Sequence, residues 1–408
     1  MTITLNFKCV TPAMPANKRL LLTAALLLLG GCAPRTETDL VLRGSVEDNL
    51  PVSSIILGRV LDQQYDHIEP IDTLSVSSDG DFEMRSDTLP PALYALVPMT
   101  DESYNNTILY AFLEPGVNKV TVGVSPSRFL TIHAEGTDLA ERYQAYADGM
   151  SRAANRQLMD SLENEFNRVR SLGDDEAMRQ IKEKTDPYFY KSEENRQAYV
   201  DSVMSGDLPT DLFGLYLFYT NRLPRLSLNT IDEINSVREE LGHFDPVTQE
   251  SDMYRNAVAI LDHSSQSAVG VEAPEISGTT PEGERITLSD LRGKFVLVDF
   301  WSSTCTWCRA ETPGLRRVYE TFAGDHFTIL GVSEDAEREP WLHAIEEDKV
   351  TWPQILLDRE AISPTNRVYN IRGIPQILLL DPEGKILHRD LRGDAIYEAV
   401  NAALQSTH

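Results

Sequence analysis

Hydrophobic and polar positions follow three different patterns along the 408 residues of the chain. Over residues 41–133, short runs of β-forming residues such as 54–60, 92–97 and 117–122 are separated by turns rich in Gly, Pro and Asp. Short β runs with regular turns are typical of a small sandwich or an open barrel. We therefore predict a β-rich domain at residues 32–135.

The period changes to that of a helix after residue 136. Leu158, Leu162, Phe166 and Val169 recur every three or four residues, which places them on one helical face. A polar run at 264–267 then marks a boundary, so a helical region is predicted at 136–268. Its further helices are expected at about 175–204, with a break near Pro187, and at 210–221, 229–241 and 247–262.

The third pattern combines a strand, a cysteine pair and a helix. Residues 295–300 form an apolar run with one acid, and Cys305 and Cys308 follow in the sequence Cys-Thr-Trp-Cys. Leu315, Val318, Tyr319 and Phe322 then recur at helical spacing. A strand that leads through Cys-x-x-Cys into a helix is the context in which this spacing indicates redox chemistry, because the helix N-terminus stabilises a thiolate.

Two structural alternatives compete with a redox pair. A zinc site needs further cysteines or histidines at ligand spacing, but the other cysteines are Cys9 and Cys32, and His326 and His343 form no such pattern. A structural disulfide closing so short a loop constrains the unfolded chain very little. The sequence therefore favours redox chemistry, with no metal and no added cofactor.

Charge and composition narrow the classes of partner. The chain is 41% hydrophobic and 25% charged, with 37 Lys and Arg against 63 Asp and Glu, a formal charge of -26. This composition predicts a globular chain of two or three domains. The acidic balance argues against nucleic acid and against electrostatic attachment to anionic lipid.

The N-terminus predicts a compartment. Lys18 and Arg19 precede an apolar stretch at 20–29 that is too short to span a bilayer, and Gly30, Gly31 and Cys32 follow. This ending resembles the bacterial lipobox, so residues 1–31 are expected to be a lipoprotein signal peptide and Cys32 the lipidated residue. A plain cleaved signal peptide is the alternative, and the start could be Met1 or Met14. We expect a cell-envelope protein, held by its lipid at the inner or outer membrane and facing the periplasm.

Residues 269–408 resemble the thioredoxin superfamily, in particular its extracytoplasmic TlpA/ResA branch. The resemblance implies an α/β thioredoxin-like domain, a mixed sheet flanked by helices. The β-rich region likewise resembles a domain of unknown function that precedes thioredoxin modules in bacterial lipoproteins. The segments that carry the first resemblance are 273–276, 286–294, 298–301, 311–313, 373–375 and 381–385.

The resemblance implies roles for four residues. Cys305 would attack a client disulfide, and Cys308 would resolve the mixed disulfide. Asp299 would be a buried acid that accepts the proton of Cys308. Glu311, on the same helical side as Cys308, would tune the thiols. The alternative for Glu311 is a surface salt bridge with a neighbouring arginine, Arg309 or Arg316.

A second set of residues concerns client binding. Ile374 and Pro375 resemble the cis-proline turn, whose exposed backbone pairs with a substrate segment; a trans bond is the alternative. Trp307 is expected to contact substrate, although it stands where proline is common in the family. Likewise, Thr304 stands where many members of the family have tryptophan. Because the residues around the cysteines affect the redox potential, the potential cannot be carried over.

The predicted function is a membrane-anchored reductase of protein disulfides. Two nearby acids disfavour the thiolate and so favour a reducing dithiol. Its partners would be protein disulfides, among them apocytochromes during cytochrome c maturation, and an upstream membrane electron donor. One alternative is a peroxiredoxin-type thiol peroxidase, for which Ser302 fits loosely but Val298 fills the slot that needs proline. The other is a scaffold with vestigial thiols.

Overall fold

The computed structural model describes residues 39–47, 50–60, 68–100, 104, 108–125, 128–172 and 175–406. The predicted signal peptide and the lipidation site Cys32 lie outside the described residues. Within the described ranges, no helix combines the length and the apolar character that crossing a bilayer requires.

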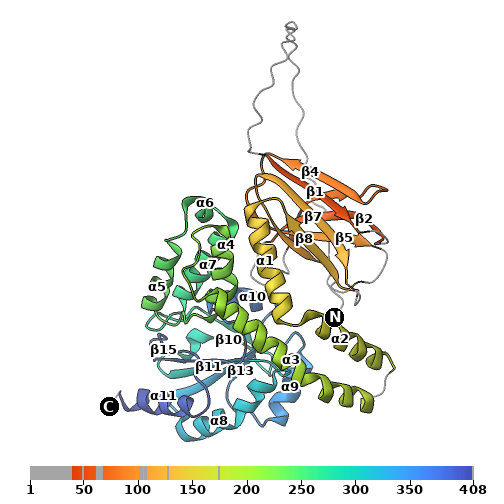
Figure 1. Cartoon of the computed structure of the whole chain (residues 1–408). Helices are drawn as coiled ribbons and strands as arrows, with labels where there is room; N and C mark the ends of the chain where they lie inside the picture. Colours follow the sequence, from red (N-terminus) through yellow and green to blue (C-terminus); the bar gives the residue numbers. More distant parts are fainter. Residues whose placement is uncertain are drawn as a thin grey trace, which may run out of the picture. The chain divides into compact units, whose positions relative to one another are not determined.

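The described N-terminal residues form two four-stranded sheets, ordered β4-β1-β7-β8 and β3-β2-β5-β6 (Figure 1). Alternate residues of each sheet, such as Leu42, Leu57 and Leu96, are buried in one common core. This result confirms the predicted β-rich region. The strands are β1 (Leu40–Val46), β2 (Val52–Val60), β3 (Ile68–Ser75), β4 (Asp81–Ser86), β5 (Ala92–Thr100), β6 (Leu109–Leu113), β7 (Gly116–Val124) and β8 (Leu130–Glu135).

A helical region follows, as predicted. The expected break near Pro187 is wrong, because α3 continues through this residue. Pro187 is exposed, so the carbonyl group one turn earlier, which loses its N–H partner, can bind water instead. The helices are α1 (Asp138–Ala153), α2 (Arg156–Ser171), α3 (Asp175–Val203), α4 (Leu212–Leu217), the π-helical turn η1 (Phe218–Arg222), the 3-10 turn η2 (Leu223–Arg225), α5 (Ile231–Leu241), α6 (Pro246–Gln249) and α7 (Asp252–Gln266).

The C-terminal residues form the redox module, a mixed sheet ordered β10-β9-β13-β12-β11-β14-β15 with helices around it. The central strand β11 pairs in parallel with β12 and antiparallel with β14. The predicted thioredoxin-like fold is confirmed. Its elements are β9 (Ser277–Thr279), β10 (Arg285–Thr287), η3 (Leu288–Leu291), β11 (Phe295–Trp301), α8 (Thr306–Phe322), β12 (Phe327–Ser333), α9 (Arg338–Glu347), β13 (Gln354–Leu356), α10 (Arg359–Val368), β14 (Gln376–Leu380), β15 (Ile386–His388) and α11 (Asp394–Gln405).

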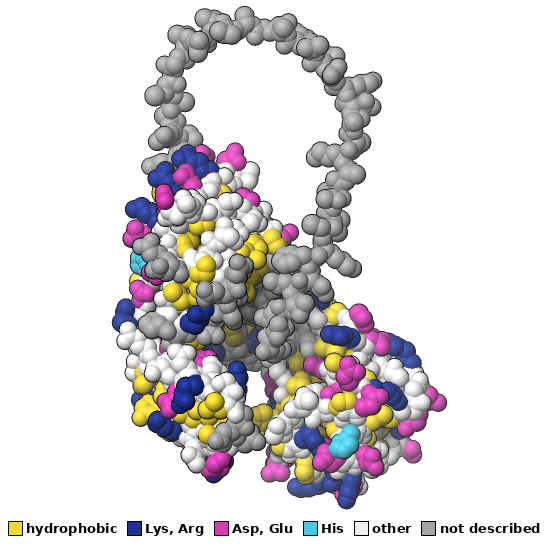
Figure 2. Space-filling view, turned by 90° about the vertical axis from the view of Figure 1, so that its right-hand side faces the viewer, with side chains coloured by type: hydrophobic (Ala, Val, Ile, Leu, Met, Phe, Trp, Pro, Cys, Tyr) yellow, Lys and Arg dark blue, Asp and Glu magenta, His cyan; other side chains and the backbone are white. Residues whose placement is uncertain are grey.

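Strand β11 is buried on both faces, which explains its nearly continuous apolar sequence. Val296 and Val298 pack into one core, whereas Leu297 packs into another together with Leu315 of α8 and Val400 of α11. The end of this strand is therefore a rigid base for the residues that follow it. On the face drawn in Figure 2, acidic and basic side chains are interspersed over the described surface.

Candidate active site

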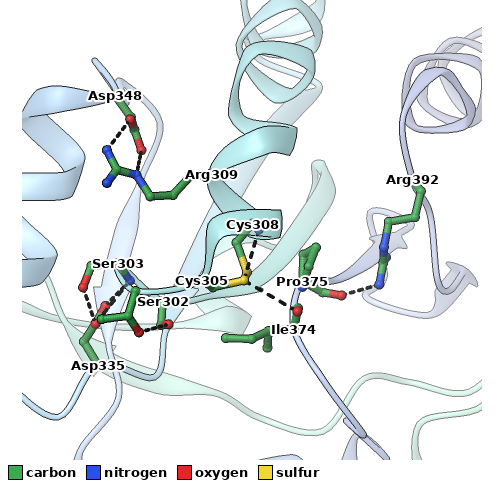
Figure 3. The surroundings of a disulfide bond; sticks show 11 residues. Ser302, Ser303, Cys305, Cys308, Arg309, Asp335, Asp348, Ile374, Pro375 and Arg392 are labelled. Atoms are coloured by element: carbon green, nitrogen blue, oxygen red, sulfur yellow. Dashed lines mark hydrogen bonds and ion pairs between the residues drawn. A yellow bond between two sulfur atoms is a disulfide. The ribbon is translucent and has the colours of Figure 1, made fainter. Parts of the chain in front are cut away.

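A disulfide joins Cys305 and Cys308 at the start of α8, with an S–S distance of 2.04 Å and a Cα–Cα distance of 5.3 Å (Figure 3). Cys305 is the N-cap of the helix, and its Sγ accepts a hydrogen bond of 3.0 Å from the backbone N–H of Cys308. Cys305 is half-buried, whereas Cys308 is 3% exposed. A client can therefore reach the first sulfur more easily than the second.

The peptide bond between Ile374 and Pro375 is cis. The carbonyl oxygen of Ile374 lies 3.6 Å from Cys305 Sγ, so this turn faces the disulfide directly (Figure 3). The pairing of β11 with β14, in which Phe300 is opposite Gln376, brings the turn and the cysteines to the same end of the sheet. The Ile374 backbone is thus placed where a client segment next to Cys305 would meet it.

Asp299 is 5% exposed in the middle of β11, and its Oδ1 has no hydrogen-bond partner among the described residues. Burial raises the pKa of this carboxyl group from 3.8 to about 7. The positive charge of Arg392 opposes the rise, and the negative charge of Glu311 adds to it. Asp299 can therefore gain or lose a proton near neutral pH.

Glu311 is half-buried on α8, where its Oε2 accepts a hydrogen bond of 3.1 Å from the backbone N–H of Gly393. Arg309 instead binds Asp348 at 2.7 Å, and Arg316 donates to the backbone carbonyl of the same residue. The site geometry thus differs from the salt bridge considered as the alternative for Glu311.

Trp307 lies between the cysteines in sequence and is 78% exposed. It stands two residues after Cys305 in the first turn of α8, where an apolar side chain open to solvent is available to a partner. Its position suits contact with a client.

Two residues near the disulfide were not expected from the sequence. The buried carboxylate of Asp335 accepts hydrogen bonds from the N–H and the hydroxyl of Ser303, at 2.9 and 2.6 Å, and from the hydroxyl of Ser333 at 2.7 Å. It thereby fixes the loop that precedes Cys305. Arg392 donates to the carbonyl oxygen of Pro375. The signal available for Asp335 was the polar run of Ser333, Glu334 and Asp335 at the end of an apolar strand, whereas the sequence around Arg392 gave none.

No group of three or more His, Cys, Asp or Glu side chains in the described part of the chain is arranged to hold a metal ion. The chain supplies a redox group of its own in the Cys305–Cys308 pair. A disulfide at a helix start, a cis-proline turn facing it and a buried acid in the preceding strand define a thiol–disulfide exchange site of the thioredoxin type.

Comparisons with known proteins agree with this class. A family model described as the AhpC/TSA family matches residues 269–389. The thioredoxin-like protein YneN of Bacillus subtilis is 34% identical over 121 residues, which are 29% of this chain and 68% of YneN. The thiol-disulfide oxidoreductase ResA of the same organism is 29% identical over 119 residues, or 29% of this chain and 64% of ResA. A crystal structure of the thioredoxin domain of a thiol-disulfide oxidoreductase from Bacteroides vulgatus shares 47% identity, with 33% of this chain and 96% of that one covered and a TM-score of 0.33.

The chain belongs to the thioredoxin superfamily, as a TlpA/ResA-like member, and this confirms the predicted family. Its enzymatic class is thiol–disulfide oxidoreductase. The family match lies within the redox module.

Proposed function

We propose that the protein is a reductase of protein disulfides in the cell envelope, anchored through lipidated Cys32 and facing the periplasm. The observation that carries the proposal is the position of the half-buried sulfur of Cys305, 3.6 Å from the carbonyl oxygen that precedes a cis-proline. A client segment that pairs with the Ile374 backbone as an added strand would present its own disulfide to that sulfur. Exposed Trp307 would contact the same segment.

The reaction starts from the dithiol. The Cys305 thiolate attacks one client sulfur, a bond forms between the two, and the client disulfide breaks, releasing its second sulfur as a thiolate that takes up a proton. Cys308 transfers its proton to the Asp299 carboxylate and attacks Cys305 Sγ. The Cys305–Cys308 disulfide forms, and the first client sulfur leaves as a thiolate that is then protonated. Two electrons and two protons pass to the client.

The acids in the strand and helix that carry the pair support the reducing direction. Asp299 and Glu311 disfavour negative charge on the thiols, and a dithiol that ionises reluctantly gives up its electrons more readily. An upstream dithiol donor in the membrane then has to reduce the Cys305–Cys308 disulfide after each turnover. Oxidised apocytochromes awaiting haem attachment are one class of client with the required disulfide.

Trapping tests the proposal. Cys308→Ala cannot complete the second step, so it should accumulate mixed disulfides between Cys305 and client proteins in envelope extracts, whereas Cys305→Ala should form none. Purified wild type should also reduce a peptide disulfide when a dithiol donor is supplied. If both variants instead bind the same partner proteins equally well and neither forms a mixed disulfide, the protein is a scaffold with unused thiols.

A thiol peroxidase is the second candidate, because the matching family model is that of the AhpC/TSA family. Val298 occupies the slot where that chemistry needs proline, and it is buried within β11. Peroxide consumption that exceeds disulfide reduction under the same donor would favour this candidate.

Membrane attachment needs its own measurement. Cys32→Ser should move the chain from the membrane fraction to the soluble fraction of the envelope, because two or three acyl chains supply the anchor. A variant chain that stays in the membrane fraction after a high-salt wash would exclude the lipid as the anchor.

A further inference from the structure

One short segment of the helical region lies against the redox site. Residues 223–229, which we call the bracing segment, begin with the 3-10 turn η2 directly after the π-helical turn η1. Leu223 and Leu228 of this segment are fully buried in the core of the helical region. These two leucines therefore hold the segment firmly to the helical region.

Arg372, which comes two residues before Ile374, binds the carbonyl groups of this segment. Its Nη1 lies 2.7 Å from the oxygen of Pro224, 3.2 Å from that of Leu223 and 3.3 Å from that of Leu226. The last carbonyl groups of a helical run carry negative partial charge, so a guanidinium group suits them well, including that of Leu223, which also accepts a hydrogen bond from the N–H of Leu226.

The bracing segment holds a second loop beside the disulfide. Asn229 donates from Nδ2 to Oδ2 of Asp390 at 2.7 Å. Two residues after Asp390 comes Arg392, which donates to the carbonyl oxygen of Pro375. Both loops that meet at the cis-proline turn are thus connected to the same seven residues of the helical region.

The turn needs such support from outside. Gly373, between Arg372 and Ile374, has open space at the place a Cβ would take: apart from these two neighbours, no residue has a heavy atom within 4 Å of it. Glycine also has the greatest backbone freedom of any residue. Contacts of Gly373 itself therefore do little to fix the turn, and Arg372 supplies a fixed point two residues before the backbone that faces Cys305.

We propose that the bracing segment holds the cis-proline turn in the conformation that binds a client, with Arg372 as the positioning residue. This inference rests on the proposed function, in which the client pairs with the Ile374 backbone. It gives the helical region a role in client affinity while leaving the exchange chemistry of the two sulfurs to the redox module.

Kinetics of the full chain test the proposal. Arg372→Gln should raise KM for a peptide disulfide about three- to tenfold, the loss expected for one or two hydrogen bonds, with kcat nearly unchanged. Its reaction with a small aromatic disulfide, which needs no strand pairing, should stay within about twofold of wild type. Arg372→Lys keeps one charged donor, so its KM for the peptide disulfide should lie between those of wild type and Arg372→Gln. Arg225→Gln is the matched control, because Arg225 lies on the same segment but pairs with Asp201 of α3.

Two results would overturn the proposal: a KM for Arg372→Gln equal to that of Arg225→Gln, or a parallel loss with the small disulfide. Hydrogen exchange provides a readout that needs no client. Amides of residues 371–374 and 376 should exchange faster in Arg372→Gln than in wild type and in Arg225→Gln, and unchanged exchange would also overturn the proposal. A wild type that reduces no peptide disulfide would refute the proposed function, whereas hydrogen exchange would still decide the role of Arg372.

Discussion

Arg392 donates a hydrogen bond from its guanidinium group to the backbone carbonyl oxygen of Pro375, the cis residue that faces the disulfide. The same positive charge lowers the pKa of Asp299 against the larger effect of burial. One side chain therefore acts on both the turn proposed to bind the client and the carboxyl group proposed to accept the proton of Cys308.

Substitution of Arg392 should separate these two effects. In Arg392→Gln the charge is lost, so the Asp299 pKa should rise and the midpoint of the pH profile of client reduction should move upward by about half a unit. Arg392→Lys keeps the charge and should retain the wild-type midpoint, while its altered hydrogen bond to Pro375 raises KM. Measurement of kcat/KM against pH distinguishes the variants, and an equal midpoint in both would refute the electrostatic role.

Asp299→Asn removes the proton acceptor without changing the size of the side chain. The resolving step should slow at least about tenfold, because a positioned general base typically contributes more than this. Mixed disulfides with clients should then persist in the variant, as in a milder form of the Cys308→Ala trap. Quenched-flow analysis of the mixed disulfide measures the step, and a decay rate equal to that of wild type would exclude Asp299 as the acceptor.

The same variant should alter the pH dependence of stability. Since burial raises the Asp299 pKa from 3.8 to about 7, the folded chain holds a proton in this interval that the unfolded chain has released. The stabilisation is complete below the unfolded pKa and is lost as pH rises through 7. Asp299→Asn should therefore gain up to about 4 kcal/mol over wild type at high pH and little at low pH. Urea unfolding at both ends of the range tests the sign.

Asp335 should prove necessary for the order of the loop before the cysteines. Asp335→Ala leaves the hydroxyl of Ser333 and the N–H of Ser303 without their buried acceptor, at a cost of about 1–3 kcal/mol of stability per group. Ser333→Ala removes two bonds, the one that its hydroxyl donates to the Asp335 carboxylate and the one that it accepts from the Asp335 N–H, at a cost of about 1–3 kcal/mol, but it leaves both bonds from Ser303 in place. We expect the rate at which a small dithiol reduces the Cys305–Cys308 disulfide to change in Asp335→Ala and to equal that of wild type in Ser333→Ala. Similar behaviour of the two variants would contradict a role in loop position.

Trp307 should report the redox state by fluorescence. The other three tryptophans, Trp301, Trp341 and Trp352, are buried, so emission at the long-wavelength edge comes from Trp307. Because disulfides quench nearby indoles, reduction should increase the emission, and Trp307→Phe should remove the long-wavelength part of the change, whereas Trp301 and Trp341, which share a buried cluster with Cys308, should contribute the rest. The variant should also raise KM for a peptide client about threefold or more through loss of apolar contact. A wild-type signal that persists in Trp307→Phe would place the reporter elsewhere.

The local sequence was sufficient to predict the residues at the centre of the site. The apolar run of β11, the spacing of Cys305 and Cys308 and the helical positions of Leu315 and Val318 all lie within a few turns of one another, so their periods predict a strand, a turn and a helix. The family resemblance added Pro375. Pro187 shows the limit of a local rule, because its exposure to solvent decides whether a helix tolerates it.

The supporting residues could not be predicted in this way. Asp335 reaches a loop 32 residues earlier, and Arg372 binds carbonyl groups up to 149 residues away. Which residues become partners over such distances depends on how the crossover connections and the separate regions of the chain pack together. The periodicity of the sequence does not encode this packing. Arg392 is exposed and lies beside a glycine, so its surroundings resemble those of an ordinary surface arginine until the fold is known.

The pairing of Phe300 in β11 with Gln376 in β14 has a consequence for inhibitor design. Since the sulfur atoms and the cis-proline turn extend from adjacent strands of one hydrogen-bonded ladder, the sheet brings them together, and the contacts of Arg372 and Arg392 hold the turn without a closing lid. A short extended peptide with a thiol-reactive group at the position opposite Cys305 would meet a preformed surface. Such compounds could be designed from a single conformation of the enzyme.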